Sequence, residues 1–194
     1  MYKIDRHPDP IRILGLMTGS SADGLDICLV RFSGSDYKPE YKIEFATEIP
    51  YPEEFQTAFR NPLDLSDAQI TFLDRELGSW FAIQIKLLNL NFDVIASHGQ
   101  TIKHEPPKFT LQIGDPSFMA KQFNVPVIYD FRTADIKQGG QGAPLIPIVD
   151  RLIFQKDHRI SWHSTLVGLP TLQLFPRVII RLPYSHGILD LEIP

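Results

Sequence analysis

The rest of this 194-residue chain is organised around one stretch, Leu14-Gly15-Leu16-Met17-Thr18-Gly19-Ser20-Ser21-Ala22-Asp23-Gly24-Leu25-Asp26. Strand-forming apolar residues flank its centre, from Ile11 to Met17 and from Leu25 to Phe32. The centre holds glycines, hydroxyl residues and aspartate, so the stretch predicts a β-hairpin with a polar turn. Such a turn is either an ordinary hairpin loop or a cradle in which backbone N–H groups and hydroxyls meet phosphate oxygens, with Asp26 near a cation or a water. The local sequence leaves both interpretations open.

Composition indicates a soluble globular protein. Hydrophobic residues make up 43% and charged residues 22%, which is the usual balance of a folded soluble domain. The net charge of -4 gives no electrostatic reason to expect binding to nucleic acid or to an anionic membrane. The single cysteine, Cys28, excludes an internal disulfide framework and is expected as a small core side chain in a reducing compartment. No apolar run has transmembrane length and the first residues lack a signal-peptide core, so a cytoplasmic location is expected.

Beyond the hairpin the chain predicts a third strand and then alternating helices and strands. The third strand, Tyr41 to Ile49, would extend the hairpin into an antiparallel meander. The elements expected after it are a helix starting near Pro52, a long helix capped by Ser66, strands at 93–97 and 109–113, a helix at 117–123, a strand at 125–129 and a helix at 145–154. This order is typical of an α/β domain with a mixed sheet.

The long helix has the clearest pattern. Ser66 is a candidate N-cap, and Gln69 stands where it would complete a capping box. Apolar residues then recur at spacings of three and four, which predicts an amphipathic helix facing the core: Ile70, Leu73, Leu77, Phe81, Ile85 and Leu88.

Polar residues gather where four of the strands end, at 18–26, 97–101, 114–115 and 130–142. In α/β folds, binding sites collect in the loops at strand ends. Four such clusters on one sheet therefore predict a binding cleft more strongly than any one of them does.

The polar residues of these clusters also have structural interpretations. His98 is either a substrate contact or a structural histidine whose hydrogen bonds are satisfied within the protein. Asp115 is either a ligand contact or the N-cap of the following helix, and we favour the N-cap. Arg132, predicted on a loop, would bind a carboxylate or phosphate or would pair with Asp135. Around Gln141, glycines would hold an anion on backbone N–H groups or form a flexible turn.

The clusters together resemble the anhydro-N-acetylmuramic acid kinase family. The family's hairpin reads Gly-Leu-Met-Ser-Gly-Thr-Ser-Met-Asp-Gly-Ile-Asp, and residues 15–26 match it except at Thr18, Ser20, Ala22 and Leu25. Ser20 keeps a hydroxyl, whereas Ala22 is smaller than the usual residue and would loosen local packing. Four more motifs follow in the family's order: Ser97-His98-Gly99-Gln100-Thr101, Leu111-Gln112-Ile113-Gly114-Asp115-Pro116, Asp130-Phe131-Arg132 and Gly139-Gly140-Gln141-Gly142-Ala143-Pro144-Leu145.

The resemblance implies the amino-terminal lobe of an actin-like, ribonuclease-H-like ATPase fold. It implies an ATP-dependent kinase that takes 1,6-anhydro-N-acetylmuramic acid to N-acetylmuramic acid 6-phosphate in the recycling of cell-wall sugar. The partners are then ATP and a sugar, with a homodimer suggested for the full-length family. The residues that would bind the ATP phosphates are Gly19, Ser20, Ser21, Ala22, Asp23, Gly24, Leu25 and Asp26, with Asp26 near Mg²⁺. The residues that would contact the sugar are Arg132, His98, Asp115 and Gln141.

The resemblance ends near Ser161, so we expect a kinase lobe over residues 1–160 and a non-family tail over 161–194. The family's next motifs, Asn-Ile-Gly-Gly-Ile-Ala-Asn and Asp-Thr-Gly-Pro-Gly-Asn, are absent, and the second carries the family's general base. Residues 164–171 and 187–193 can be written back into DNA with suitable synonymous codons. When each DNA stretch is translated from its third base, it encodes one of the two missing motifs, and the two appear in the family's order. We therefore hypothesise a single frameshift near Ser161, which leaves this chain without a catalytic base.

The sequence also leaves two alternative hypotheses for the function of this chain. The first is a catalytically inactive fragment that lacks the general base and the second lobe. The second is an unrelated hydrolase that uses His98 and Asp115, and this reading requires activity without ATP.

Overall fold

The computed structural model describes residues 10–19, 22–35 and 38–146, together with the backbone of short strands at 163–164, 170–171, 178–184 and 187–193. The chain divides into two units, residues 1–35 with 40–143 and residues 36–39 with 144–194. The predicted boundary at residue 160 lies outside the described residues and stays a prediction.

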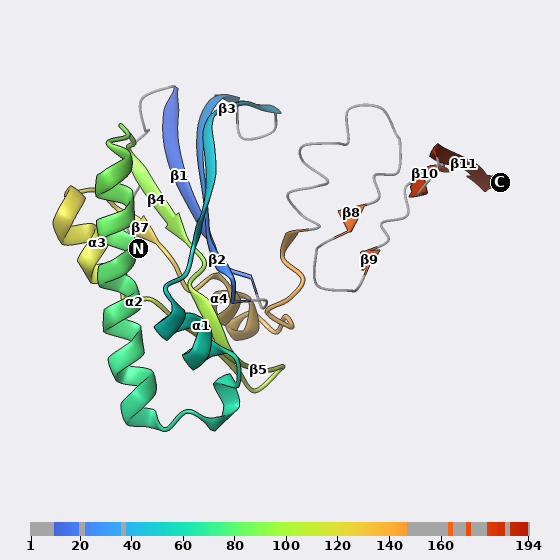
Figure 1. Ribbon diagram of the computed structural model, residues 1–194. Helices are drawn as coiled ribbons and strands as arrows, with labels where there is room; N and C mark the ends of the chain where they lie inside the picture. The colour runs from blue at the N-terminus through green and yellow to red at the C-terminus, as the bar shows by residue number, and fades with distance from the viewer. Residues whose placement is uncertain are drawn as a thin grey trace. The chain divides into compact units, whose positions relative to one another are not determined.

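The first unit is built on a five-stranded mixed sheet in the order β3-β2-β1-β4-β7 (Figure 1). Strand β1 pairs antiparallel with β2 and parallel with β4, and β4 pairs parallel with β7. The strands are β1 (Ile11–Met17), β2 (Gly24–Ser35), β3 (Lys38–Pro50), β4 (Val94–Ser97) and β7 (Val127–Ile128). This confirms the α/β class and a mixed sheet that starts with an antiparallel hairpin.

A separate two-stranded hairpin joins β5 (Gln100–Glu105) to β6 (Phe109–Ile113). The sequence predicts β6 with the observed bounds but does not predict β5. Strand β5 holds Lys103, His104 and Glu105 among its six residues, and this polar composition hides the strand pattern.

The helices of this unit are α1 (Glu53–Phe59), α2 (Asp67–Leu88), α3 (Pro116–Phe123) and α4 (Phe131–Lys137), with a 3₁₀ turn η1 at Pro62–Asp64. Helix α2 begins with the predicted capping box, because the Ser66 side chain accepts from the Gln69 backbone N–H while the Gln69 side chain accepts from the Ser66 N–H at 2.9 Å. Helix α2 packs against α3. The prediction that Arg132 and Asp135 lie on one loop is wrong, since both belong to α4.

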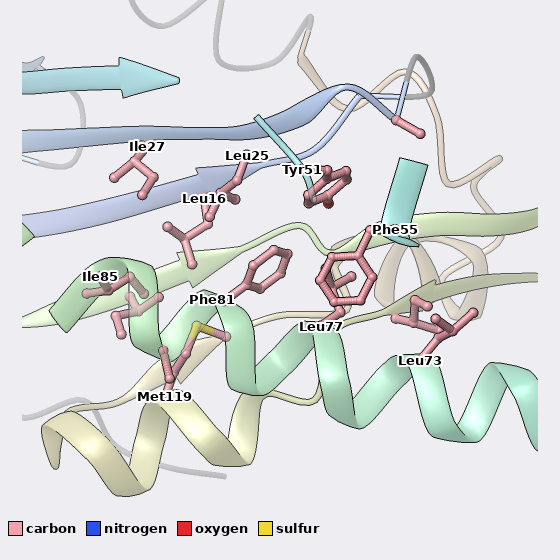
Figure 2. Packing of buried hydrophobic residues seen from close by; sticks show 14 of the residues in the cluster. Leu16, Leu25, Ile27, Tyr51, Phe55, Leu73, Leu77, Phe81, Ile85 and Met119 are labelled. Carbon is pink, nitrogen blue, oxygen red and sulfur yellow. The ribbon is translucent and has the colours of Figure 1, made fainter. Parts of the chain in front are cut away.

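The core lies between α2 and the sheet (Figure 2). Leu77 and Phe81 of α2 are fully buried, as are Leu14 of β1 and Ile95 of β4. Ile70 and Leu88 lie at the edge of this core and are partly buried, so the predicted apolar face of α2 is confirmed. Met119 brings α3 into the same core.

An aromatic cluster closes one end of the core. The Tyr51 ring lies 5.7 Å from Phe55, 5.7 Å from Phe59 and 5.3 Å from Trp80, measured between ring centroids. Aromatic pairs at such separations contribute about 0.5–1.5 kcal/mol each beyond the area they bury. The cluster therefore anchors α1 to α2 beside the end of β3.

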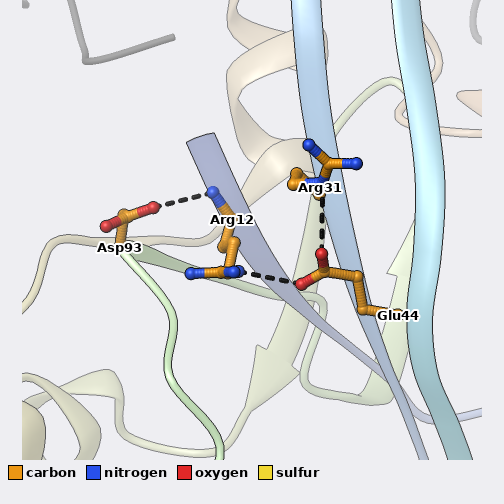
Figure 3. Close-up of polar contacts among 4 residues, drawn as sticks. All are labelled: Arg12, Arg31, Glu44 and Asp93. Carbon is orange, nitrogen blue, oxygen red and sulfur yellow. Dashed lines mark hydrogen bonds and ion pairs between the residues drawn. The ribbon is translucent and has the colours of Figure 1, made fainter. Parts of the chain in front are cut away.

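Arginines from neighbouring strands share one carboxylate on the solvent side of the sheet (Figure 3). Arg12 and Arg31 lie directly opposite each other in the β1–β2 ladder, which places two like charges side by side. Glu44 of β3 accepts from Arg12 Nε at 2.8 Å and from Arg31 Nε at 3.1 Å. Asp93 also accepts from the Arg12 backbone N–H at 2.7 Å, which ties the start of β4 to β1.

The remaining predictions fall at the ends of the first unit and in the second. The strand predicted at 125–129 shortens to β7, and the helix predicted at 145–154 lies outside the described residues beyond Ile146. The second unit contains two antiparallel pairs, β8 (His163–Ser164) with β9 (Pro170–Thr171) and β10 (Val178–Tyr184) with β11 (Gly187–Ile193). None of the helices that the structure describes is long and apolar enough to cross a membrane.

Candidate functional site

The turn of the β1–β2 hairpin forms the first part of the site. The ladder closes with Met17 opposite Asp26, and the connection between β1 and β2 covers positions 18–23. Ala22 has a left-handed backbone, with φ at 54°, and donates its N–H to the Gly19 carbonyl oxygen at 3.2 Å. The predicted hairpin is therefore confirmed, while the predicted phosphate contacts Ser20 and Ser21 lie outside the described residues.

A buried hydrogen-bond network fixes the base of this turn. Thr18 Oγ1 donates to the Gly99 carbonyl at 2.7 Å, and Gln100 Nε2 donates to the Gly19 carbonyl at 3.3 Å. The hydroxyl of Tyr51 donates to Gln100 Oε1 at 3.3 Å. Burial raises the pKa of Tyr51, so its hydroxyl keeps its proton and acts as a donor. The hairpin turn is thereby attached to the polar cluster that follows β4.

The other predicted phosphate-binding residues differ in whether the side chain or only the backbone is accessible to a ligand. Leu25 is fully buried in the core, so only its backbone is available to a ligand. At Gly24 a Cβ atom would lie 2.6 Å from the Ile49 carbonyl oxygen, so glycine is needed there for the close approach of β3. Asp23 and Asp26 are exposed, and the backbone carbonyl of Asp23 accepts from the Tyr51 N–H at 2.8 Å.

Asp26 fits the role of a magnesium ligand in part. Within the part of the chain that the structure describes, no three His, Cys, Asp or Glu side chains gather in a way that would hold a metal ion. Mg²⁺ in phosphoryl-transfer sites, however, keeps several waters and takes one or two carboxylates together with substrate phosphates. Asp26 is one exposed carboxylate beside the polar turn, which is compatible with this mode of binding.

His98 and Arg132 form the second part of the site. Arg132 Nε donates to His98 Nε2 at 2.9 Å, and His98 Nδ1 lies 2.8 Å from the Gly99 carbonyl oxygen. These bonds require a neutral imidazole that carries its proton on Nδ1. Burial first, and then the Arg132 charge, lower the pKa of His98, although the Gly99 hydrogen bond opposes this. The pKa of Arg132 is also lowered by burial.

Arg132 lies on helix α4, so the prediction that places it on a loop with Asp135 is wrong. The Asp135 carboxylate instead accepts from the Gly142 backbone N–H at 2.7 Å, and its carbonyl accepts from Gly140 N–H at 2.9 Å. These bonds hold the glycine turn against α4. Gln141, within that turn, is exposed.

Asp115 has the structural role that the sequence favours. Its Oδ1 accepts from the Ser117 backbone N–H at 2.9 Å and caps α3. Its backbone N–H donates to the Asp74 carbonyl at 3.0 Å, and Asp74 Oδ1 accepts from the Gly114 N–H at 2.7 Å. Asp115 is thus part of the joint between α2 and α3.

A cavity of about 270 Å³ lies where these elements meet. His98 is the one predicted sugar contact among its lining residues. The polar side chains of its wall that sequence reasoning missed are Asp74, Ser97, Gln112, Asp130 and Thr133. Ser97 and Gln112 stand inside motifs that the sequence singles out, but only the fold reveals that both face one cavity.

Comparison with known proteins gives a consistent result. Residues 11–175 match the family model described as anhydro-N-acetylmuramic acid kinase, which extends past the predicted end of the resemblance. The chain is 32% identical over 180 residues to anhydro-N-acetylmuramic acid kinases of Bacillus thuringiensis subsp. konkukian (strain 97-27) and of Bacillus cereus (strain AH820). Each alignment covers 84% of this chain and 47% of the relative, so the chain spans about half the length of these curated relatives.

The mixed sheet, with its antiparallel start and polar strand ends, is that of the amino-terminal lobe of a sugar kinase with an actin-like fold. Within that class, the chain belongs to the anhydro-N-acetylmuramic acid kinase family.

Proposed function

We propose that this chain is the amino-terminal lobe of an ATP-dependent kinase for 1,6-anhydro-N-acetylmuramic acid. In the reaction, water adds to C1 as the anhydro bond to the 6-oxygen breaks, and the 6-oxygen takes the γ-phosphoryl group of ATP. The products are N-acetylmuramic acid 6-phosphate and ADP. The observation that carries the proposal is the attachment of the hairpin turn, through Thr18 and Gly99, to the His98–Arg132 pair.

We assign the phosphates of ATP to residues 19–26, where backbone N–H groups are suited to phosphate oxygens. Asp26 would hold Mg²⁺, which when bound neutralises phosphate charge. The Nε of Arg132 already donates to His98, so the two Nη groups of its guanidinium would bind the sugar. His98, Asp115 and Gln141 complete the proposed sugar side, with Asp115 free to contribute only what its capping bond leaves available. A cytoplasmic location and a homodimer of the full-length protein belong to the same proposal.

A second candidate is that this chain is itself catalytically inactive. It spans 47% of its curated relatives, and the motif that carries the family's general base does not occur in its reading frame. Loss of a general base alone lowers a rate by roughly two to four orders of magnitude. We infer that the frameshift near Ser161 has removed both the base and the opposite wall of the cleft.

The test is a phosphorylation assay with ATP, Mg²⁺ and the anhydro sugar, read by mass spectrometry of the product. The chain as it stands is compared with the product of a gene in which a one- or two-base change near codon 161 restores the frame. We expect the 6-phosphate from the restored protein and little or none from this chain. Turnover by this chain at the rate of the restored protein would disprove the hypothesis that this chain is inactive. Conversion of the sugar without ATP would support the hypothesis of an unrelated hydrolase instead.

If no one- or two-base change near codon 161 of the resequenced locus restores the two missing motifs, the frameshift is disproved. A restored protein in which Asp26→Asn leaves the rate and its magnesium dependence unchanged would remove Asp26 from the metal site.

A further inference from the structure

The glycine turn that follows α4 is fixed to that helix through its own backbone. The Gly139 N–H donates to the Ile136 carbonyl at 2.9 Å, and the Gly140 N–H donates to the Asp135 carbonyl at 2.9 Å. The Gly142 N–H donates to Asp135 Oδ2 at 2.7 Å. The three glycine N–H groups that the sequence suggested for an external anion are therefore used within the protein.

The carboxylate of Asp135 takes the place of that anion. Its Oδ2 accepts the Gly142 N–H, and a Cβ atom on Gly140 would collide with the same carboxylate, lying 2.6 Å from its Oδ1. The carboxylate thus lies directly against the turn. A negative charge in the last turn of a helix opposes the helix dipole, so α4 alone does not favour aspartate at this position. The contact with the glycine turn accounts for it.

The far end of the turn is held sterically as well. Gly142 is buried and has φ at 69°. A Cβ atom there would lie 3.0 Å from Ile136 Cδ1 and 3.2 Å from the Arg132 carbonyl oxygen. The chain therefore returns closely onto the helix that carries Arg132, and the turn is rigid rather than flexible.

Gln141 is the one side chain that this rigid turn presents to solvent. It is exposed, whereas Gly140 before it is half-buried and Gly142 after it is buried. A side chain on a backbone that is already ordered loses less entropy when it binds a ligand. Its amide carries both donors and an acceptor, which suits the hydroxyl and acetamido groups of a sugar. Arg132, the other proposed sugar contact nearby, stands on the same support.

We propose that Asp135 is a positioning residue: its carboxylate acts as a built-in anion that holds the glycine turn and so sets the place from which Gln141 meets the sugar. Asp135 acts through Gln141 and does not itself touch the ligand. The inference rests on the proposed function for the nature of the ligand, but it does not require turnover.

The first measurement is amide hydrogen exchange at Gly142, followed by NMR on the purified full chain. Asp135→Ala should speed this exchange by about tenfold or more, because it removes a hydrogen bond to a charged group. Asp135→Asn keeps an acceptor oxygen and should restore most of the protection. Asp64→Ala, which removes an exposed carboxylate on η1, is the matched control and should change nothing at Gly142.

The second measurement is binding of 1,6-anhydro-N-acetylmuramic acid to the same proteins, titrated by saturation-transfer NMR at millimolar concentrations. Asp135→Ala and Gln141→Ala should each weaken binding by about three- to tenfold, the value of one hydrogen bond. The double variant should bind no more weakly than Gln141→Ala alone, and Asp135→Asn should bind as the unmodified chain does. An aspartate that only stabilises the fold would leave the contribution of Gln141 intact, so the two losses would add.

Unchanged exchange at Gly142 in Asp135→Ala overturns the inference. Additive losses, or sugar binding that Asp135→Ala does not weaken, also overturn it and leave the proposed function standing. Absence of sugar binding by the unmodified chain overturns both the proposed role of Gln141 and the inference that rests on it. A coupled loss of binding, with no phosphorylation by the frame-restored protein, upholds the inference and disproves the kinase.

The urea midpoint of each variant shows whether it folds. If Asp135→Ala does not fold, Gly140→Ala replaces it, because the added Cβ displaces the carboxylate without removing it. This variant should show the same faster exchange at Gly142 and the same coupling to Gln141→Ala. Normal exchange and normal sugar binding in Gly140→Ala would overturn the inference.

Discussion

The protonation state of His98 decides whether its imidazole can accept the hydrogen bond from Arg132. It accepts from Arg132 and therefore holds the guanidinium in place only while neutral. Burial lowers its pKa from the ordinary value of 6.5, so the folded chain binds this proton less readily than the unfolded chain does. Stability from the neutral imidazole is present above the ordinary pKa and is lost as the pH falls from there through the folded value.

We therefore expect the urea midpoint of unfolding to fall as the pH is lowered from about 7.5 to about 5. His98→Gln removes the titration and should flatten this dependence, at the cost of lower stability at neutral pH. His104→Gln is the control, because His104 also has a lowered pKa but is more exposed and should change the slope less. An unchanged slope in His98→Gln would show that another group is responsible.

Gly78 sets the distance between α2 and the backbone of Asp115. A Cβ at this position would collide with the Asp115 backbone, including its nitrogen at 2.7 Å. Helix propensity alone predicts that Gly78→Ala stabilises the chain by about 1 kcal/mol. We expect the opposite sign, a loss of about 1–3 kcal/mol, because backbone atoms cannot move aside cheaply.

Equilibrium denaturation measures the sign directly. Glu76→Ala, at an exposed position of the same helix, reports the effect of propensity without the collision. A stabilising Gly78→Ala would mean that α2 can shift away from Asp115 at little cost.

At the scale of elements, α2 and the first hairpin could be predicted from sequence because their apolar residues repeat with one period and their ends carry recognisable caps or turns. Helix α4 could not, since it has seven residues, no side-chain cap, and an N-cap residue, Asp130, with a left-handed φ of 58°. Its polar start resembles a loop. Ser97 and Gln112 were missed for a different reason, because a buried polar atom without a partner is recognisable only after β4 and β6 have been brought together.

The capping box of α2 provides the prediction for this scale. Ser66→Ala should cost about 1 kcal/mol in unfolding free energy, the usual value for loss of an N-cap. The Ser66 and Gln69 side chains act on each other's backbone, so the double variant with Gln69→Ala should lose less than the two single losses added together. Strict additivity in a double-mutant cycle would show that the two bonds do not cooperate.

At the scale of the whole molecule, the core cluster of the described residues belongs to the first unit. Every buried apolar residue of the core cluster in the described ranges lies between Leu14 and Met119. The second unit begins at residue 144 apart from four residues at 36–39. The fold of the first unit was largely predictable because its core pattern is local to it.

Ending the chain after residue 146 should therefore leave one cooperative unfolding transition with a midpoint close to that of the full chain. Circular dichroism during urea unfolding measures this. A lost or strongly broadened transition would show that residues 147–194 support the first unit.

The carbonyl oxygen of Gly99 accepts from Thr18 at the base of the hairpin turn and lies within hydrogen-bond distance of His98 Nδ1. One atom thus joins the nucleotide side of the proposed site to the arginine side. A ligand that orders the turn restrains this carbonyl, and a ligand that orders Arg132 restrains it from the other side. We therefore expect each ligand to lower the entropic cost of binding the other. Thermodynamic reciprocity requires that two such ligands raise each other's affinity by the same factor, whichever binds first.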